Sequence, residues 1–344
     1  MSSTRSTKGW TVEGNGSFDA LKFQKDRILP ELTANDVLVK FHAASVNYRD
    51  VIIALGHYPF PVAPNIVPGS DGAGEVVEVG SKVTRFEKGA KVVTLFGQGH
   101  QYGEVTLKSL GTGLGGAIDG TFQQYGIFNE NGLSYMPENL SYLEAGTLSC
   151  APLTVWNALY GLKPVVPGDW VLTQGTGGVS IAALQFAKAA GARVIATTSS
   201  SAKAETLKKL GADHVINYKT NPNWGDEAKK VSGGVHHVIE VGGSKTLTES
   251  LKAAAIGGVV SIIGWVGGPG EKGVDFPQIL ASMAIVRPLV VGSREQFEAM
   301  IRAVEAFDIK PVIDQNIFKL EDLKEAYQYQ WDQKHFGKVV IRIE

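Results

Sequence analysis

The feature that most constrains this chain is an apolar run that enters a glycine-rich turn and leaves it as a helix. WVLTQG (170–175) has the length and composition of a buried strand, and SIAALQFAKAAG (180–191) carries apolar residues at helical spacing before a glycine stop. The glycines of the intervening GTGGVS (175–180) let backbone N–H groups approach a pyrophosphate at the positive end of the helix. The turn therefore predicts a dinucleotide site, to which we assign Gly175, Thr176, Gly177, Gly178, Val179 and Ser180, with Ser180 in place of the third glycine of the general fingerprint.

Strand-like and helical segments alternate around this turn. The further strand-like runs are ARVIATT (192–198), DHVINY (213–218), HHVIEV (236–241) and GVVSIIG (258–264). Five strands with helical crossovers predict an α/β fold with a doubly wound parallel sheet. The chain before about residue 130 has short β-type runs instead, and β-type sequence returns after a helical segment at 294–307. The glycine-rich segment Gly97–Gly120 reads equally as a binding loop and as a surface excursion.

The residues that follow the second strand indicate which dinucleotide is bound. An Asp or Glu in that place would bond the adenosine ribose of NAD, but TTSSSAK (197–203) contains no acid. The hydroxyls of Ser199 and Ser200 and the cation of Lys203 suit a ribose 2′-phosphate. Tyr218, which ends the third strand, either adds a phenol to the same phosphate or is an ordinary strand-end tyrosine. The sequence therefore predicts NADP(H).

Composition excludes several function classes. A length of 344 residues suggests about two domains, and 33 Lys plus Arg against 34 Asp plus Glu give a formal net charge of −1. No overall field would hold such a chain on nucleic acid or on an anionic membrane. Cys150 is the single cysteine, so an intramolecular disulfide is impossible. We expect no signal peptide, no transmembrane segment and a cytoplasmic location.

Four motifs extend over most of the chain and resemble one family. They are AASVNYRDVIIALGHYPFP (43–61), PGSDGAGEVVEVGSKVTRFEKGAKV (68–92), GTGGVSIAALQFAKAAGARVIAT (175–197) and HFGKVVI (335–341). The chain resembles the medium-chain dehydrogenase/reductase superfamily, in particular its zinc-free quinone oxidoreductase-like branch. The resemblance implies a GroES-like β-rich catalytic domain formed by 1–132 with 293–344, and an inserted Rossmann NADP(H)-binding domain at 133–292, with the active site between them. It also implies a homodimer or homotetramer.

Departures from the zinc-dependent alcohol dehydrogenases bear on the metal. A catalytic zinc there needs two thiolates and an imidazole. Against that pattern, Asn47 stands in place of the first cysteine, Ser70 in place of the histidine with Asp71 in place of the following glutamate, and Cys150 at the third ligand position. We therefore expect no catalytic metal.

The resemblance also suggests site residues. Asn47 is expected near the nicotinamide ribose and the acceptor, with a turn amide as the simpler interpretation, while Asp50 fixes the local loop. Tyr58 is expected either to donate a hydrogen bond to the acceptor oxygen or only to pack. Thr154, Gly264 and Trp265 complete the predicted cofactor-binding set, although Trp265 is equally interpreted as a core or dimer-contact residue.

Without a metal to polarise a carbonyl, hydride transfer needs an acceptor that is already electrophilic. The predicted function is therefore an NADPH-dependent, zinc-independent oxidoreductase acting on a small-molecule carbonyl, namely a quinone or an α,β-unsaturated carbonyl. The alternatives are an alcohol dehydrogenase or carbonyl reductase on the same scaffold and a non-catalytic NADPH-binding protein. No side chain stands out as proton donor, so we expect solvent to supply the proton.

Overall fold

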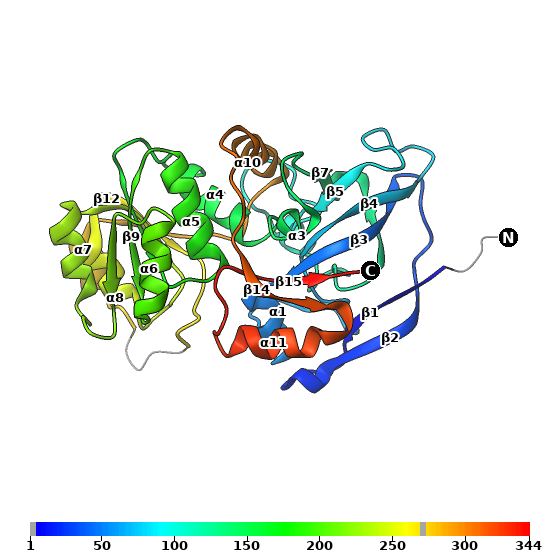
Figure 1. Cartoon of the computed structure of the whole chain (residues 1–344), viewed down its shortest axis with the longest axis horizontal. Coiled ribbons are helices and arrows are strands. Elements are labelled where there is room, and N and C mark those ends of the chain that lie inside the picture. Colours follow the sequence, from blue (N-terminus) through cyan, green and yellow to red (C-terminus); the bar gives the residue numbers. More distant parts are fainter. Residues whose placement is uncertain (1–4, 269–272) are drawn as a thin grey trace. The chain divides into compact units, whose positions relative to one another are not determined.

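The computed structural model describes residues 5–268 and 273–344, and its chain forms two compact units (Figure 1). Unit 1 is Met1–Leu153 with Gly292–Glu344, and unit 2 is Thr154–Val291. The first boundary lies later than the expected 132/133, because β7 (Leu133–Tyr135) pairs with β5 (Lys91–Thr94) of the unit 1 sheet. The return to unit 1 falls at Gly292, next to the expected position.

Unit 2 is built around a six-stranded parallel sheet in the order β10-β9-β8-β11-β12-β13. Its strands are β8 (Trp170–Gln174), β9 (Arg193–Thr198), β10 (His214–Asn217), β11 (Val235–Glu240), β12 (Ala254–Ile262) and β13 (Ile285–Pro288). The α/β prediction is confirmed, and the five expected strands are present. The prediction missed β13, since four residues are too few for a periodicity signal.

The strand order in unit 2 reverses between β8 and β11, which are neighbours in the sheet but not consecutive in sequence. Ligands of doubly wound sheets bind outside the carboxyl ends of the strands at such a switch point. The helices are α4 (Ala151–Tyr160), which spans the unit boundary, α5 (Gly178–Ala189), α6 (Ser201–Lys209), α7 (Trp224–Ser232), α8 (Leu247–Ala253) and α9 (Phe276–Ser282). The fold therefore places the glycine turn after β8 and the loop after β11 at the same edge of the sheet, where the strands have their carboxyl ends.

Unit 1 has a mostly antiparallel sheet in the order β14-β15-β3-β4-β5-β7, with β6 also paired to β3. The remaining strands of the unit are β1 (Ser6–Val12), β2 (Leu21–Ile28), β3 (Asp36–Val46), β4 (Asp71–Val79), β6 (Tyr125–Asn129), β14 (Ile313–Lys319) and β15 (Lys338–Arg342). Its helices are α1 (Tyr48–Ala54), α2 (Leu107–Leu110), α3 (Tyr142–Ala145), α10 (Arg294–Ala306) and α11 (Leu323–Trp331). Strands from both ends of the chain thus lie side by side in one sheet.

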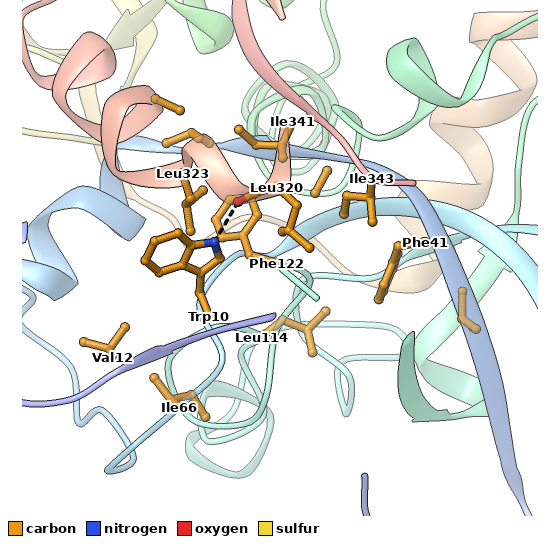
Figure 2. Packing of buried hydrophobic residues seen from close by; sticks show 14 of the residues in the cluster. Trp10, Val12, Phe41, Ile66, Leu114, Phe122, Leu320, Leu323, Ile341 and Ile343 are labelled. Atoms are coloured by element: carbon orange, nitrogen blue, oxygen red, sulfur yellow. Dashed lines mark hydrogen bonds between the residues drawn. The ribbon is translucent and has the colours of Figure 1, made fainter. Parts of the chain in front are cut away.

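The core of unit 1 joins residues that are far apart in sequence (Figure 2). Trp10 is 5% exposed and packs with Phe122 and Leu323, and its indole Nε1 donates a hydrogen bond of 2.7 Å to the carbonyl of Leu320. A buried indole N–H without such a partner would cost free energy, so this bond lets a large ring fill the core. The core therefore fixes the C-terminal strands against the N-terminal part of the unit.

The segment Gly97–Gly120 is neither a free excursion nor a regular element. It contains α2, its Leu114 is fully buried, and backbone bridges join Gly97 to Gly113 and Leu114 to Ile118. A side chain at Gly120 would collide with the carbonyl of Gly69, so glycine is required there for the close approach of the two backbones. Residues 113–116 of the segment are thus buried in unit 1.

None of the helices in the described ranges is long and apolar enough to cross a membrane.

Candidate active site

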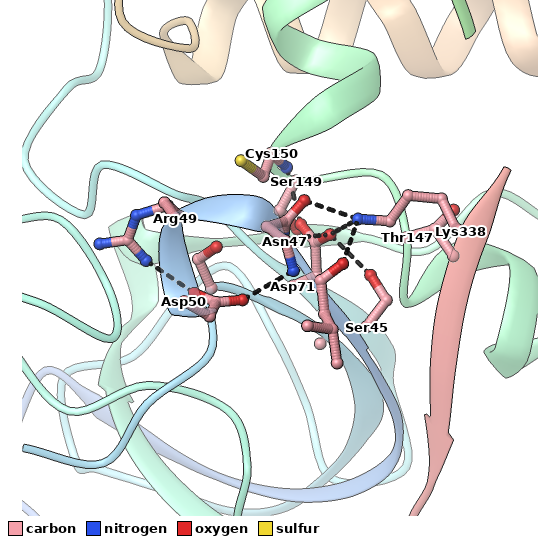
Figure 3. Close-up of polar contacts among 12 residues, drawn as sticks. Ser45, Asn47, Arg49, Asp50, Asp71, Thr147, Ser149, Cys150 and Lys338 are labelled. Carbon is pink, nitrogen blue, oxygen red and sulfur yellow. Dashed lines mark hydrogen bonds and ion pairs between the residues drawn. The ribbon is translucent and has the colours of Figure 1, made fainter. Parts of the chain in front are cut away.

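Strand register brings three charged or polar residues together in unit 1. Strand β3 lies between β4 and β15, with Ser45 opposite Asp71 and Val46 opposite Val339. Asn47, which follows β3 directly, therefore lies beside Asp71 at the start of β4 and Lys338 at the start of β15. Figure 3 shows these side chains converging on one point. The register of the central strand, rather than any local motif, builds this cluster.

Asp71 is the centre of the cluster and is fully buried. Its Oδ2 accepts hydrogen bonds from the hydroxyl of Ser45 at 2.7 Å, from Nδ2 of Asn47 at 2.9 Å and from the ammonium of Lys338 at 3.0 Å. Its Oδ1 accepts a bond of 2.7 Å from the backbone N–H of Cys150. The carboxylate therefore ties together four segments of the chain.

Asn47 has both ends of its amide engaged in this cluster. Its Oδ1 accepts a hydrogen bond of 2.6 Å from Nζ of Lys338, while its Nδ2 donates to Asp71. Its backbone N–H donates to Oδ2 of Asp50 at 2.8 Å, which fixes the start of α1 as expected of Asp50. The amide is 7% exposed. Asp50, Asp71 and Lys338 thus hold Asn47 in place. The contact of Asn47 with an acceptor stays a prediction.

A second buried charge pair lies beside the first. Nη1 of Arg49 donates to Oδ1 of Asp50 at 3.1 Å and to the carbonyl of Leu114 at 2.9 Å, and the guanidinium carbon lies 5.1 Å from the centre of the Tyr58 ring. Burial raises the pKa of Asp50 to about 6, against the opposing effect of Arg49. Burial opposes the charge of Arg49, but Tyr58 and Asp50 outweigh it, so the pKa of Arg49 is above its usual value. Arg49–Asp50 and Lys338–Asp71 are therefore two neighbouring ion pairs without net charge.

The donor set at the family's zinc position does not fit a tetrahedral zinc ion. The amide oxygen of Asn47 already accepts a bond from an ammonium group, which would repel a metal cation. Burial, together with the charge of Asp71, raises the pKa of the Cys150 thiol to about 12, whereas zinc binds the thiolate. Ser70 contributes a buried hydroxyl that has no hydrogen-bond partner in the described chain, and a neutral hydroxyl is not among the usual zinc ligands. Across residues 5–268 and 273–344, no group of three or more His, Cys, Asp or Glu is placed to hold a metal.

The glycine turn of unit 2 has the geometry of an anion cradle. Gly175 has a φ of +76°, which only glycine adopts readily, and Gly177 caps α5 without a side-chain hydrogen bond. The first N–H groups of this 12-residue helix therefore lack a capping side chain and suit a phosphate. The hydroxyl of Ser180 donates to the carbonyl of Gln174 at 2.5 Å and fastens the helix to β8. A dinucleotide pyrophosphate fits this turn.

The residues predicted to bind the ribose 2′-phosphate lie after the carboxyl ends of β9 and β10. Ser200 caps α6, since its Oγ accepts a bond of 3.3 Å from the N–H of Lys203. The N–H of Tyr218 donates to the carbonyl of Thr198, so this 40% exposed tyrosine lies beside the turn that contains Ser199. The structure therefore brings the predicted Ser199, Ser200, Lys203 and Tyr218 to neighbouring strand ends.

Glu240 is a buried acid at the switch point that the sequence analysis missed. Its Oε1 accepts bonds from the N–H groups of Gly242 at 2.8 Å and Gly243 at 2.9 Å, and from the hydroxyl of Thr246 at 2.6 Å. Its Oε2 accepts bonds from Nε2 of Gln174, which ends β8, and from the hydroxyl of Ser250. The carboxylate thus joins the carboxyl ends of β8 and β11. The signal available in the sequence was an acid, Glu240, within the apolar end of the strand-like run HHVIEV (236–241).

The predicted Gly264 and Trp265 rest on the segment that Glu240 holds. The N–H of Val266 donates to the carbonyl of Val241 at 2.9 Å, and a side chain at Gly243 would lie 2.8 Å from Cβ of Trp265. Trp265 is 38% exposed, so it is not a core residue. Thr154 is buried in α4 and belongs to unit 2. Apart from Asn47, the predicted cofactor-binding residues thus all belong to unit 2, whereas Asn47 and Tyr58 belong to unit 1.

A parallel sheet with an anion-binding turn at its switch point, combined with a β-rich unit made from both ends of the chain, is typical of dinucleotide-dependent oxidoreductases. Residues 33–138 match the family model of the alcohol dehydrogenase GroES-like domain, and residues 178–306 match that of the zinc-binding dehydrogenase. The chain belongs to the medium-chain dehydrogenase/reductase superfamily, and the nicotinamide dinucleotide is the cofactor class of this fold.

Relatives cover nearly the whole chain. A zinc-type alcohol dehydrogenase-like protein of Schizosaccharomyces pombe is 48% identical over 95% of this chain and 96% of its own length. An alcohol dehydrogenase of Geobacillus stearothermophilus is 30% identical over 92% and 94%, and a 2-methylene-furan-3-one reductase of Solanum lycopersicum is 32% identical over 97% and 78%.

Solved structures have the same fold. A putative alcohol dehydrogenase of Sinorhizobium meliloti has a TM-score of 0.89 at 36% identity, covering 99% of this chain and 100% of its own. An NAD-dependent alcohol dehydrogenase has a TM-score of 0.86 at 31% identity, covering 98% and 100%. A mycobacterial protein complexed with NADPH has a TM-score of 0.82 at 25% identity, with the same coverage. The neighbours thus include both an NAD-dependent and an NADPH-bound protein.

Proposed function

We propose that this protein is an NADP(H)-dependent, zinc-independent oxidoreductase that transfers hydride to a quinone or an α,β-unsaturated carbonyl. The observation that carries the proposal is the bond of 2.6 Å from Lys338 to the amide oxygen of Asn47. This bond places an ammonium group against the oxygen that would have to bind a metal. An acceptor that no metal polarises has to be electrophilic by itself, as conjugated carbonyls are. The tomato relative named as a reductase of such a compound supports this choice.

The residues of unit 1 supply binding and orientation. A dinucleotide held by the glycine turn of unit 2 would supply the hydride. The hydroxyl of Tyr58 lies 3.4 Å from Nε of Arg49 as an acceptor, which leaves its own proton for a hydrogen bond to the acceptor oxygen. The amide of Asn47, held by Lys338 and Asp71, orients the reacting groups.

An acceptor panel tests this function. We expect chelator-treated protein to oxidise NADPH with an ortho-quinone, a cyclic enone or an alkenal, and to leave a saturated ketone unchanged, because conjugation makes the first three the stronger hydride acceptors where hydrogen bonds alone polarise the carbonyl. NADPH consumption is measured by absorbance, with NADH as the second donor. Activity with the saturated ketone alone, or only after zinc is added, would instead establish the alcohol dehydrogenase alternative. Dinucleotide binding without turnover of any acceptor would establish the non-catalytic one.

Lys203 carries the proposed preference for NADP(H). A charge-assisted bond to the 2′-phosphate contributes about 1.5–3 kcal/mol. Replacing Lys203 by Ala should therefore weaken NADPH binding by about tenfold or more and change NADH binding by less than about twofold. Both dissociation constants are measured by nicotinamide fluorescence. Lys208→Ala provides the matched control, since it removes a lysine of the same helix that pairs with Glu205. Equal losses for both dinucleotides in the Lys203 variant would contradict the assignment.

A further inference from the structure

Arg49 is a firmly anchored cation of unit 1, and its ion pair with Asp50 does not engage all of its N–H groups. Its Nη1 is bound by the carboxylate of Asp50 and the carbonyl of Leu114. The guanidinium carbon lies 5.1 Å from the ring centre of Tyr58 and 4.9 Å from that of Phe96. Because these contacts fix the guanidinium plane, the direction of its remaining N–H groups is fixed as well.

Those remaining N–H groups belong to Nη2. This amino group makes no hydrogen bond or ion pair within 5–268 or 273–344, and it is not among the fully buried polar atoms that lack a partner. It is therefore a donor with some exposed surface on a side chain that is only 11% exposed. A donor with exposed surface on an otherwise immobilised cation is available to a ligand in a fixed direction.

Gly116 makes room for this amino group. A Cβ built at residue 116 would lie 2.8 Å from Nη2 of Arg49, closer than atoms in contact can be. Any other residue there would displace the guanidinium. The Gly97–Gly120 segment therefore binds Nη1 through the Leu114 carbonyl, and the absence of a side chain at Gly116 leaves room for Nη2.

Arg85, a second arginine of the same unit, shows the contrast. Like Nη1 of Arg49, Nη1 of Arg85 has two acceptors, which are the backbone carbonyls of Glu130 and Leu133. Its guanidinium carbon lies 5.1 Å from the ring centre of Phe86. Its Nη2, however, is bound by the carboxylate of Glu298 at 3.2 Å. Arg85 is thus a satisfied structural arginine, whereas Arg49 has the same kind of support with one donor group left over.

We propose that Nη2 of Arg49 binds the carbonyl oxygen of the acceptor and stabilises the negative charge that develops there during reduction. This inference rests on the proposed function. For an α,β-unsaturated carbonyl, hydride forms a new C–H bond at the β-carbon, and the electron pair of the C=C bond moves so that the carbonyl oxygen becomes an enolate oxyanion. A proton from solvent then adds to the α-carbon and restores the carbonyl. The acceptor gains two electrons, the dinucleotide is oxidised by two, and Arg49 keeps its proton throughout.

The test combines turnover with the binding of an oxyanion mimic. The Arg49→Met variant should reduce 2-cyclohexenone with a kcat about 10²–10³-fold below that of the wild type, as expected for a lost oxyanion donor, and its KM for NADPH should change by less than about threefold. The Arg49→Lys variant should lie between the two. Arg85→Met is the matched control and should keep the wild-type kcat.

The second readout is the ionisation of bound 4-nitrophenol, followed by its absorbance in protein saturated with oxidised dinucleotide. Wild-type protein should lower the pKa of the bound phenol by about one to three units, and Arg49→Met should abolish the shift, since an opposite charge at contact distance has this effect. A merely structural Arg49 would not move this value. Wild-type kcat in Arg49→Met, or the same phenol pKa in both proteins, would overturn the inference. A phenol shift that depends on Arg49, in a protein that reduces no enone, would keep the oxyanion site and reject the proposed function.

Discussion

Replacing Lys338 by Met is expected to lower the free energy of unfolding by about 3–5 kcal/mol, because it leaves a buried carboxylate without its cation. Lys338 is 5% exposed and Asp71 is fully buried, so water cannot replace the lost partner. The amide oxygen of Asn47 loses its donor in the same step. Urea denaturation followed by tryptophan fluorescence measures the change. Because the chain forms two compact units, the relevant quantity is the transition that reports on unit 1.

Two controls separate the ion pair from packing. Lys82→Met removes an exposed lysine of the same unit and should change the stability by less than about 0.5 kcal/mol. Combining Lys338→Met with Asp71→Asn removes both charges, so the double variant should regain a large part of the loss even though it carries one more substitution. A Lys338→Met variant that unfolds at the wild-type urea concentration would show that Asp71 does not depend on this ammonium.

Replacing Glu240 is expected to weaken dinucleotide binding strongly, because its carboxylate holds the loop after β11. Glu240→Ala removes an acceptor that five donors share, and it leaves the N–H of Gly243 and the hydroxyl of Ser250 without another acceptor among the described residues. The N–H of Gly242, the hydroxyl of Thr246 and the amide of Gln174 each keep one further acceptor. Unsatisfied buried donors cost about 1–3 kcal/mol each, which is enough to displace the loop. Glu240→Gln keeps the volume but turns an NH₂ group toward two or three donors. We expect about tenfold to hundredfold weaker binding of the dinucleotide in both variants, measured by nicotinamide fluorescence.

Glu227→Gln is the control for this experiment. Glu227 lies on α7, bonds to His214 and Asn221, and is half-buried in the same unit. The Glu227→Gln variant should be somewhat less stable than the wild type but should bind the dinucleotide with the same affinity. The reason is that neither partner of Glu227 belongs to the loops after β8 or β11. If Glu240→Gln bound the dinucleotide as the wild type does, the carboxylate would be a folding element without influence on the cofactor loops.

The glycine turn shows what local sequence predicts well. The strand WVLTQ, the positive φ at Gly175 and the helix that begins at Gly178 are consecutive, so apolar spacing and glycine placement were sufficient to predict them. The same holds for the five strands of unit 2 that the pattern predicts. β13 and the late boundary of unit 1 were not predicted, because β7 and β13 have three and four residues and are defined by their pairing partners.

The polar cluster shows what local sequence does not predict. Asn47 and Asp71 are 24 residues apart, and Lys338 is 291 residues from Asn47. Their meeting depends on how β3 aligns with β4 and β15, and register between strands distant in sequence leaves no periodic signal in any of them. The sequence by itself determined the α/β fold class, the dinucleotide turn and the family. Only the tertiary structure decided that Lys338 would hold the amide of Asn47, that Glu240 would join two strand ends, and that Arg49 would keep a donor unsatisfied, because each of these depends on long-range packing.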